Sequence, residues 1–101
     1  MAVVLFVRVQ TDLDPEELER RMHERLPRFR EVPGLLQKIY GRDMDGTVCG
    51  IYFFADRESL VAFRSTELAK TIPSAYEATR VRRDVYEVIC SLNPGRGPLS
   101  E

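Results

Sequence analysis

The spacing of hydrophobic residues changes early in the chain from that of a strand to that of a helix. Residues 3–10 are β-branched and aromatic, which predicts a strand. Asp14 and Pro15 then have the types favoured at the N-cap and first position of a helix. An apolar stripe follows at helical spacing, made by Leu18, Met22, Leu26 and Phe29. Pro27 is expected to kink or end this helix.

The rest of the chain predicts three more strands and one more helix. The strands are expected over residues 35–42, 47–55 and 81–92, and Asp56 caps a helix that ends near Ile72. The order of elements is therefore β-α-β-β-α-β. With right-handed crossovers, this order predicts an α+β ferredoxin-like sandwich in which both helices cover one face of an antiparallel sheet.

Length and charge narrow the class of protein. A chain of 101 residues is too short for two domains, so we expect one domain over residues 1–92 and a flexible tail over residues 93–101. The net charge of −1 gives no reason to expect nucleic acid or an anionic membrane as a partner. The apolar run at residues 2–7 ends at Arg8, too early for a signal peptide or a membrane span.

The two cysteines indicate the cellular compartment in which the protein is expected. Cys49 and Cys90 stand far apart, each inside an apolar segment. We expect both to be small buried residues rather than disulfide partners or metal ligands. Free thiols of this kind favour a reducing compartment, so the predicted location is the cytoplasm.

Two helices can cover only one face of the predicted sheet, so the composition of the other face bears on function. Side chains alternate between faces along a strand. The row of the first strand suited to packing on helices is Val3, Leu5, Val7 and Val9. The opposite row is Val4, Phe6, Arg8 and Gln10.

The hairpin between the second and third strands decides which aromatic residues join that opposite row. A three-residue loop at residues 44–46 pairs Lys38 with Tyr52 and Leu36 with Phe54, and Gly46 supplies a positive φ. A two-residue turn instead places Tyr40 beside Ile51. We prefer the first, because it makes the aromatic row continuous. The open face then carries the candidate substrate-binding residues Phe6, Arg8, Lys38, Tyr40, Tyr52 and Phe54.

Such an aromatic face requires a cover. Four adjacent rings expose several hundred Å² of apolar surface, more than a monomer usually tolerates. A second copy of the chain across a two-fold axis is the simplest cover, which predicts a homodimer. Two facing sheets would enclose a space lined by rings and a few polar groups, as in a small-molecule pocket. The same rings could equally serve only to hold the dimer together.

Several segments together resemble a known family. Residues 32–40 read Val-Pro-Gly-Leu-Leu-Gln-Lys-Ile-Tyr, and residues 50–56 read Gly-Ile-Tyr-Phe-Phe-Ala-Asp. A helix with Phe63 and a final strand with Val-Tyr-Glu-Val at residues 85–88 follow. This arrangement, over about residues 3–92, resembles the YdhR-like family of proposed monooxygenases within the dimeric α/β-barrel superfamily. The resemblance implies a homodimer with a cavity, and an oxygenase activity on a small aromatic or quinol-like compound.

The resemblance also bears on cofactors. Haem-degrading relatives carry an Asn, a Trp and a His at positions that look like Phe6, Phe54 and Ile72 here, so haem degradation is not expected. Cofactor-free relatives oxidise phenolic or quinol-like polyketides, and we expect no cofactor here. Such a reaction depends on a substrate anion that reacts with O₂ itself. Arg8 and Lys38 are the candidate cations for that anion, unless they are charges at an interface rim.

Other polar residues give weaker signals. His23 is expected on the solvated face of the first helix, and Arg80, Arg82 and Arg83 are expected in solvent, although an anionic ligand there stays possible. Three classes of function remain: a cofactor-independent monooxygenase, a non-catalytic ligand-binding homodimer, and an RNA-binding domain. The last ranks lowest, because the third strand lacks the basic residues that flank RNA-stacking rings. No residue is singled out as the catalytic base.

Overall fold

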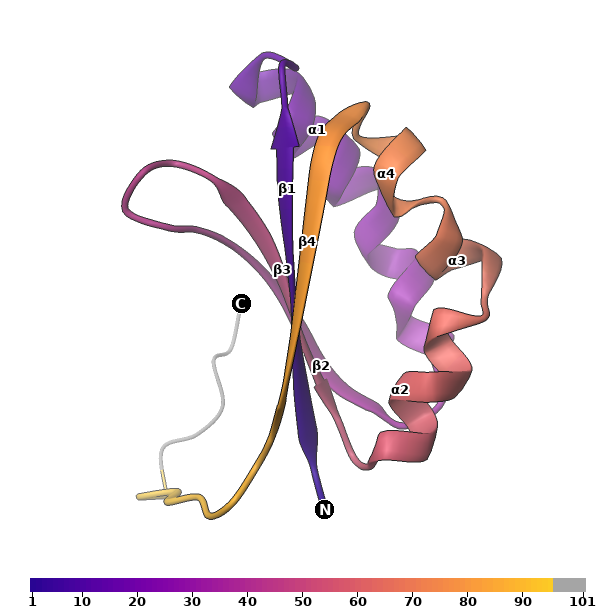
Figure 1. The fold of residues 1–101 in the computed structure, drawn as a ribbon, viewed down its shortest axis with the longest axis vertical. Helices are drawn as coiled ribbons and strands as arrows, with labels where there is room; N and C mark the ends of the chain where they lie inside the picture. The colour runs from indigo at the N-terminus through magenta and orange to yellow at the C-terminus, as the bar shows by residue number, and fades with distance from the viewer. Residues whose placement is uncertain (96–101) are drawn as a thin grey trace.

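All helices lie on one face of a four-stranded sheet (Figure 1). This computed structural model describes residues 1–95. The strands are β1 Val3–Thr11, β2 Leu35–Arg42, β3 Val48–Phe54 and β4 Ala78–Glu87. The helices are α1 Pro15–Arg25, α2 Arg57–Arg64, α3 Glu67–Lys70 and α4 Ile72–Ala75, with a 3-10 helix over Leu26–Glu31. The antiparallel sheet has the order β2-β3-β1-β4, which confirms the predicted ferredoxin-like α+β fold.

The first helix begins where the sequence predicts. The Asp14 side chain accepts a hydrogen bond from the Glu16 backbone N–H at 3.2 Å, and Pro15 occupies the first turn. At its other end α1 passes directly into the 3-10 helix, whose first turn contains Pro27. The proline therefore ends the regular helix as expected, because its ring cannot fit within an α-helix. Leu18, Met22 and Phe29 of the predicted stripe are buried.

The second crossover differs from the prediction, because it contains three short helices instead of one. Asp56 caps α2 as expected and accepts from the Ser59 backbone N–H at 2.8 Å. Thr66 then breaks the run. Its hydroxyl donates to the Phe63 carbonyl at 2.6 Å and accepts from the Ala69 N–H at 3.2 Å. One side chain thus ends α2 and caps α3.

The last strand lies earlier than the predicted residues 81–92. It covers Ala78–Glu87, because its partner β1 begins at Val3, which pairs with Glu87. The Val88 N–H still donates to the Ala2 carbonyl at 2.9 Å, but residues 88–95 belong to no strand. Cys90 consequently lies outside the sheet and is exposed, so its predicted burial is wrong, whereas Cys49 is buried. The predicted tail over residues 93–101 falls mostly outside the described residues, which end at residue 95.

The β2–β3 hairpin confirms the preferred loop. Gly46 has φ +87° and its N–H donates to the Asp43 carbonyl at 2.9 Å, so residues 44–46 form the loop. Lys38 pairs with Tyr52 as predicted. The register shifts next to Leu36, however, so Phe54 pairs with Leu35 and the predicted pairing of Leu36 with Phe54 is wrong.

Gly34 is a position where a side chain should not fit. Its φ is +77°, and a Cβ there would lie 2.0 Å from the Ser59 Oγ. That hydroxyl is fixed by a 2.7 Å hydrogen bond to Asp56. We expect Gly34→Ala to lower the free energy of unfolding by about 1–3 kcal/mol in urea denaturation, through steric clash and backbone strain.

Two glycines provide controls for that variant. Gly46→Ala meets open space but shares the positive φ, and Gly41→Ala meets open space without it. We expect Gly34→Ala to destabilise the protein most and Gly46→Ala less, and Gly41→Ala to leave the free energy of unfolding almost unchanged. Equal effects at all three positions would contradict the steric argument.

Candidate functional site

The six predicted site residues divide between the two faces of the sheet. In β3, Tyr52 pairs with Leu5 and Phe54 pairs with Val3, so both rings face the helices. Lys38 pairs with Tyr52 and lies on the same face. Tyr40, two residues along β2, shares that face. Phe6 and Arg8 belong to the alternate row of β1, on the open face. The prediction of one continuous site is therefore wrong.

Phe54 belongs to the core. Its side chain is 0% exposed, and its ring centroid lies 5.5 Å from that of Phe63 and 6.3 Å from that of Tyr52. Arg8, on the other face, forms a 3.0 Å ion pair with Asp84 and lies over the Phe6 ring at 5.8 Å. Neither Phe54 nor Arg8 lines the cavity described next.

A cavity of about 310 Å³ opens between β2 and α1. Its walls combine apolar and polar side chains: Glu19, Met22, His23, Leu26, Lys38, Ile39, Tyr40, Arg42 and Val48. A much smaller void of about 10 Å³ lies deeper, against Gly50, Tyr52 and Tyr76, and shares Met22, Tyr40 and Val48 with it. Of the six predicted site residues, Lys38 and Tyr40 line the cavity and Tyr52 lines the deeper void.

The amine of Lys38 has unusual surroundings. Its Nζ atom is buried and has no hydrogen-bond partner within residues 1–95. It lies 3.4 Å from the ring centroid of Tyr40, 4.2 Å from that of Tyr52 and 4.8 Å from that of Phe29. Burial, with a smaller contribution from the charge of Arg25, lowers the pKa of Lys38 to about 7.

Gly50 makes room for this amine. It pairs with Tyr40 in the sheet, and a Cβ added to it would lie 3.0 Å from the Lys38 Nζ. The lysine side chain thus extends across the sheet over a residue without a side chain. A larger residue at position 50 would push the amine away from the rings.

The half-buried Tyr40, whose ring lies next to the amine, is linked to the buried Tyr76. Their hydroxyls are 2.8 Å apart and share a hydrogen bond. Burial, followed by the hydrogen bond to Tyr76, raises the pKa of Tyr40, and burial also raises the pKa of Tyr52. Tyr40 and Tyr52 therefore stay protonated at neutral pH and can donate hydrogen bonds to an anion.

Arg25 supplies a permanent charge beside these rings. Its side chain is buried, and its guanidinium carbon lies 5.5 Å from the Tyr76 ring centroid and 6.0 Å from that of Phe29. One nitrogen donates to the Leu68 carbonyl at 2.9 Å, whereas Nε has no partner within the described residues. An unpaired buried donor of this kind is costly and favours an acceptor nearby.

Arg25 and Tyr76 are absent from the sequence prediction. A signal for Arg25 existed, because it lies three residues after Met22 and four before Phe29 on the inward side of the apolar stripe. Tyr76 had no comparable signal, because it follows α4, in a crossover that the sequence predicted as one helix. His23 is exposed as expected and lies at the cavity wall.

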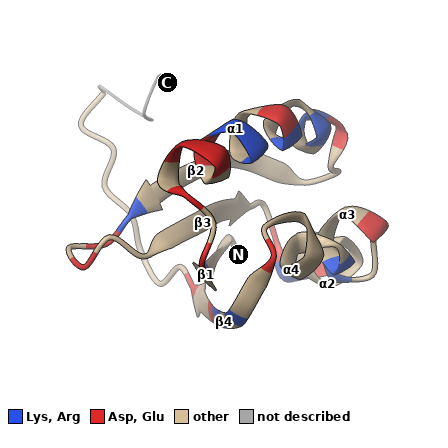
Figure 2. Cartoon of the chain, turned by 90° about the horizontal axis from the view of Figure 1, so that it is seen from above, with Lys and Arg blue, Asp and Glu red and all other residues tan. Residues whose placement is uncertain are grey.

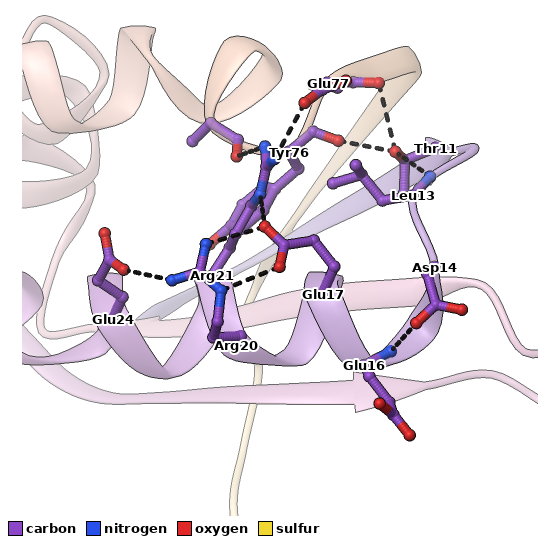
Figure 3. A network of polar contacts seen from close by, with 11 residues as sticks. Thr11, Leu13, Asp14, Glu16, Glu17, Arg20, Arg21, Glu24, Tyr76 and Glu77 are labelled. Atoms are coloured by element: carbon purple, nitrogen blue, oxygen red, sulfur yellow. Dashed lines mark hydrogen bonds and ion pairs between the residues drawn. The ribbon is translucent and has the colours of Figure 1, made fainter.

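A polar network holds Tyr76 in position (Figure 3). The Thr11 hydroxyl donates to the Tyr76 carbonyl at 2.7 Å. Arg21 donates to the Ala75 carbonyl at 3.1 Å, to Glu77 at 3.0 Å and to Glu17 at 2.7 Å. The hydrogen bonds from Arg20 and Arg21 lower the pKa of Glu17 to about 2. The network joins α1 to the segment before β4 and so fixes the Tyr40–Tyr76 pair.

Charge is mixed on the outer surface of the helices. Acidic and basic residues alternate along α1 (Figure 2), where Arg20 pairs with both Glu17 and Glu24. On the open face, Asp84 lies within 3.0 Å of Arg8 and 3.3 Å of Arg82.

Within residues 1–95, no helix is long and apolar enough to cross a membrane, and no three His, Cys, Asp or Glu side chains form a metal-binding group.

This architecture defines a ferredoxin-like α+β protein with a ligand-sized cavity between its sheet and first helix. Residues 4–94 match the family model described as "Putative mono-oxygenase ydhR". The chain therefore belongs to the YdhR mono-oxygenase family, and the predicted resemblance is confirmed. No curated protein is significantly similar to it.

Solved structures share the fold at low sequence identity. SnoaB, a cofactor-independent oxygenase from Streptomyces nogalater, superposes with a TM-score of 0.73 at 15% identity, covering 90% of this chain and 96% of SnoaB. A structure described as "a putative antibiotic biosynthesis monooxygenase from Deinococcus radiodurans" gives a TM-score of 0.72 at 11% identity, covering 92% of this chain and 97% of that chain. A dimeric ferredoxin-like protein from Jannaschia sp. gives 0.70 at 14%, covering 87% and 100%.

Proposed function

We propose that the protein is a cofactor-independent monooxygenase that oxidises a small aromatic or quinol-like compound in the cavity between β2 and α1. The observation that carries this proposal is the group of buried polar atoms at the inner end of this cavity. There, the Lys38 amine and the Tyr40 hydroxyl lie among aromatic rings in a chain of the mono-oxygenase family. The likeness to SnoaB, described as cofactor-independent, supports the absence of a cofactor.

The proposed reaction needs only substrate and O₂. An activated methylene loses a proton, and the resulting anion transfers electrons to O₂ and forms a C–O bond. Loss of water then leaves a carbonyl, so one oxygen atom enters the product, the other leaves as water, and the substrate supplies all the electrons. Met22, Leu26 and the Tyr40 ring hold the substrate ring, while the Tyr40 hydroxyl stabilises its negative charge.

The experiment is oxygen uptake by the purified full chain with a panel of hydroquinones and anthrones. We expect uptake above the buffer rate, lowered by Tyr40→Phe and unchanged by Lys70→Met, which alters an exposed residue of α3. Absence of uptake with every member of the panel would overturn the proposal. A rise in melting temperature with the same compounds but without uptake would favour the non-catalytic ligand-binding homodimer instead.

We also propose that a second copy of the chain covers the open face of the sheet. Val4, Phe6, Ile51 and Phe53 form paired apolar positions there, and Tyr86 of β4 meets the Phe6 ring edge-on at 5.6 Å while 57% exposed. Apolar patches of this kind usually mark an interface. The structure from Jannaschia, described as dimeric, supports a homodimer. The two unpaired cysteines support a reducing location such as the cytoplasm.

We expect Phe6→Glu to convert the dimer into a monomer at micromolar concentration. A carboxylate at this half-buried position would bring a charge against the apolar face of the partner, and the neighbouring Arg8 is already paired with Asp84. Sedimentation velocity measures the change, and Val61→Glu on the exposed side of α2 is the matched control that leaves the dimer intact. A wild-type chain that sediments as a monomer contradicts the proposed interface.

A further inference from the structure

The Lys38 amine combines features that a purely structural lysine lacks. Lysines usually keep the ammonium group in water and bury only the carbon stem. Here the Nζ atom is buried with no hydrogen-bond partner within residues 1–95, while the side chain as a whole keeps partial exposure at the cavity wall. Its lone pair is therefore not engaged by a neighbouring donor.

Burial of this amine and the nearby charge of Arg25 favour its neutral form at rest. Arg25 of α1 is positive, and Tyr40, Tyr52 and Tyr76 present phenols. Cys49 of β3 lies nearby as a buried thiol whose pKa is raised by burial. Glu19 is the carboxylate on the cavity wall, and it is already paired with Arg42 at 3.0 Å. Among residues 1–95, no counter-ion holds the ammonium in place, so the amine can release and accept a proton.

The same surroundings can also hold the ammonium once it forms. The faces of Tyr40, Tyr52 and Phe29 lie within 4.8 Å of Nζ, and such ring faces attract a cation. A substrate anion in the adjoining cavity would add the missing counter-charge. Both protonation states are therefore supported, one before and one after a proton leaves the substrate.

We propose that Lys38 is the general base of this site and removes the proton from the carbon or oxygen acid that binds in the cavity. This inference rests on the proposed function. The Nζ lone pair forms the new N–H bond, and the electron pair of the broken C–H or O–H bond stays on the substrate as an enolate or phenolate. After O₂ has added, the ammonium returns its proton to the terminal peroxide oxygen. Loss of the second proton from the same carbon then forms the carbonyl, breaks the O–O bond and releases the terminal oxygen with both protons as water.

Other residues of the cavity suit this role less well. Tyr40 and Tyr52 stay protonated, and a guanidinium such as that of Arg25 does not act as a proton acceptor. His23 is the main competitor, because imidazole is the most common general base. It is exposed on α1 and lines the cavity, but it does not line the deeper void beside Tyr52 and Tyr76.

The first measurement is a titration of the lysine side chains by NMR. The chain has two lysines, Lys38 and Lys70, so the exposed Lys70 is an internal reference. We expect the Lys38 signal, assigned with Lys38→Arg, to titrate near pH 7, well apart from the reference signal. Titration of the Lys38 signal in the ordinary range of a lysine side chain would overturn the proposal, because an ordinary ammonium is a poor base at neutral pH.

The second measurement tests the proton transfer itself. Deuterium incorporation into the methylene of anthrone is followed by NMR without O₂, so oxidation does not contribute. We expect wild-type protein to accelerate exchange, Lys38→Met to lose at least 100-fold of that acceleration, and Lys70→Met to retain it; His23→Gln, at the cavity wall, is expected to lose far less than Lys38→Met. Gly50→Ala, whose Cβ would press on the amine, is expected to lose part of it.

The outcomes separate this inference from the proposed function. Exchange that depends on Lys38 but leads to no oxygen uptake supports the base and overturns the oxygenase. Oxygen uptake that persists in Lys38→Met supports the oxygenase and overturns the base. Exchange that disappears in His23→Gln while Lys38→Met retains it assigns the role to the histidine and also overturns the proposal, as does the absence of exchange with wild-type protein.

Discussion

Phe54→Ala is expected to lower the free energy of unfolding by about 3–5 kcal/mol, enough to leave a domain of this size barely folded. Phe54 is fully buried where β3 packs against α2, and its ring contacts those of Tyr52 and Phe63. Truncation to alanine leaves a cavity at the centre of these rings. The surrounding sheet and helix can close it only in part.

The measurement is urea denaturation of wild type and two variants. Phe54→Leu keeps most of the buried volume and is expected to cost less than half as much as Phe54→Ala. Val61→Ala, on the exposed side of α2, is expected to stay within about 0.5 kcal/mol of wild type. A loss below about 1 kcal/mol in Phe54→Ala would return this residue to the ligand-binding role that the sequence suggested.

The placement of Phe54 in the core, and not on the open face, shows which part of the fold the sequence determines. The local signals were reliable: Asp14 and Asp56 cap helices, and Gly46 closes the hairpin, so Lys38 meets Tyr52 as predicted. These features depend on residues close together in the chain. The order of the elements follows from them, and with it the ferredoxin-like fold.

The sequence could not determine how β3 lies against β1. These strands are separated by a helix and β2, and no turn fixes their register. A shift of one residue moves every side chain of β3 to the opposite face. Tyr52 therefore pairs with Leu5 on the covered face, whereas the prediction placed it on the open face with Phe6. Burial of the Lys38 amine follows from that register, so it too was beyond local reasoning.

The structure predicts that removing the charge of Lys38 stabilises the protein at neutral pH. In the folded state the pKa of Lys38 is about 7, whereas in the unfolded chain it is near 10.4. Below pH 7 the amine is protonated in both states, and folding carries the full cost of burying an ammonium. Lys38→Met keeps the length of the side chain without that charge. We expect it to raise the free energy of unfolding at pH 7 by about 2–4 kcal/mol, since partial solvent contact of the side chain reduces the full effect.

The dependence on pH distinguishes this cause from better packing. Between pH 7 and about 10 the unfolded chain binds a proton at Lys38 that the folded protein does not. The unfolding free energy of wild type should therefore rise with pH in this window, by at most about 1.4 kcal/mol per pH unit. Lys38→Met lacks this contribution, so its advantage should shrink towards pH 9.5. Lys70→Met should retain the wild-type slope in urea denaturation at each pH. Parallel curves for wild type and Lys38→Met would show that the amine is protonated and solvated in the folded protein.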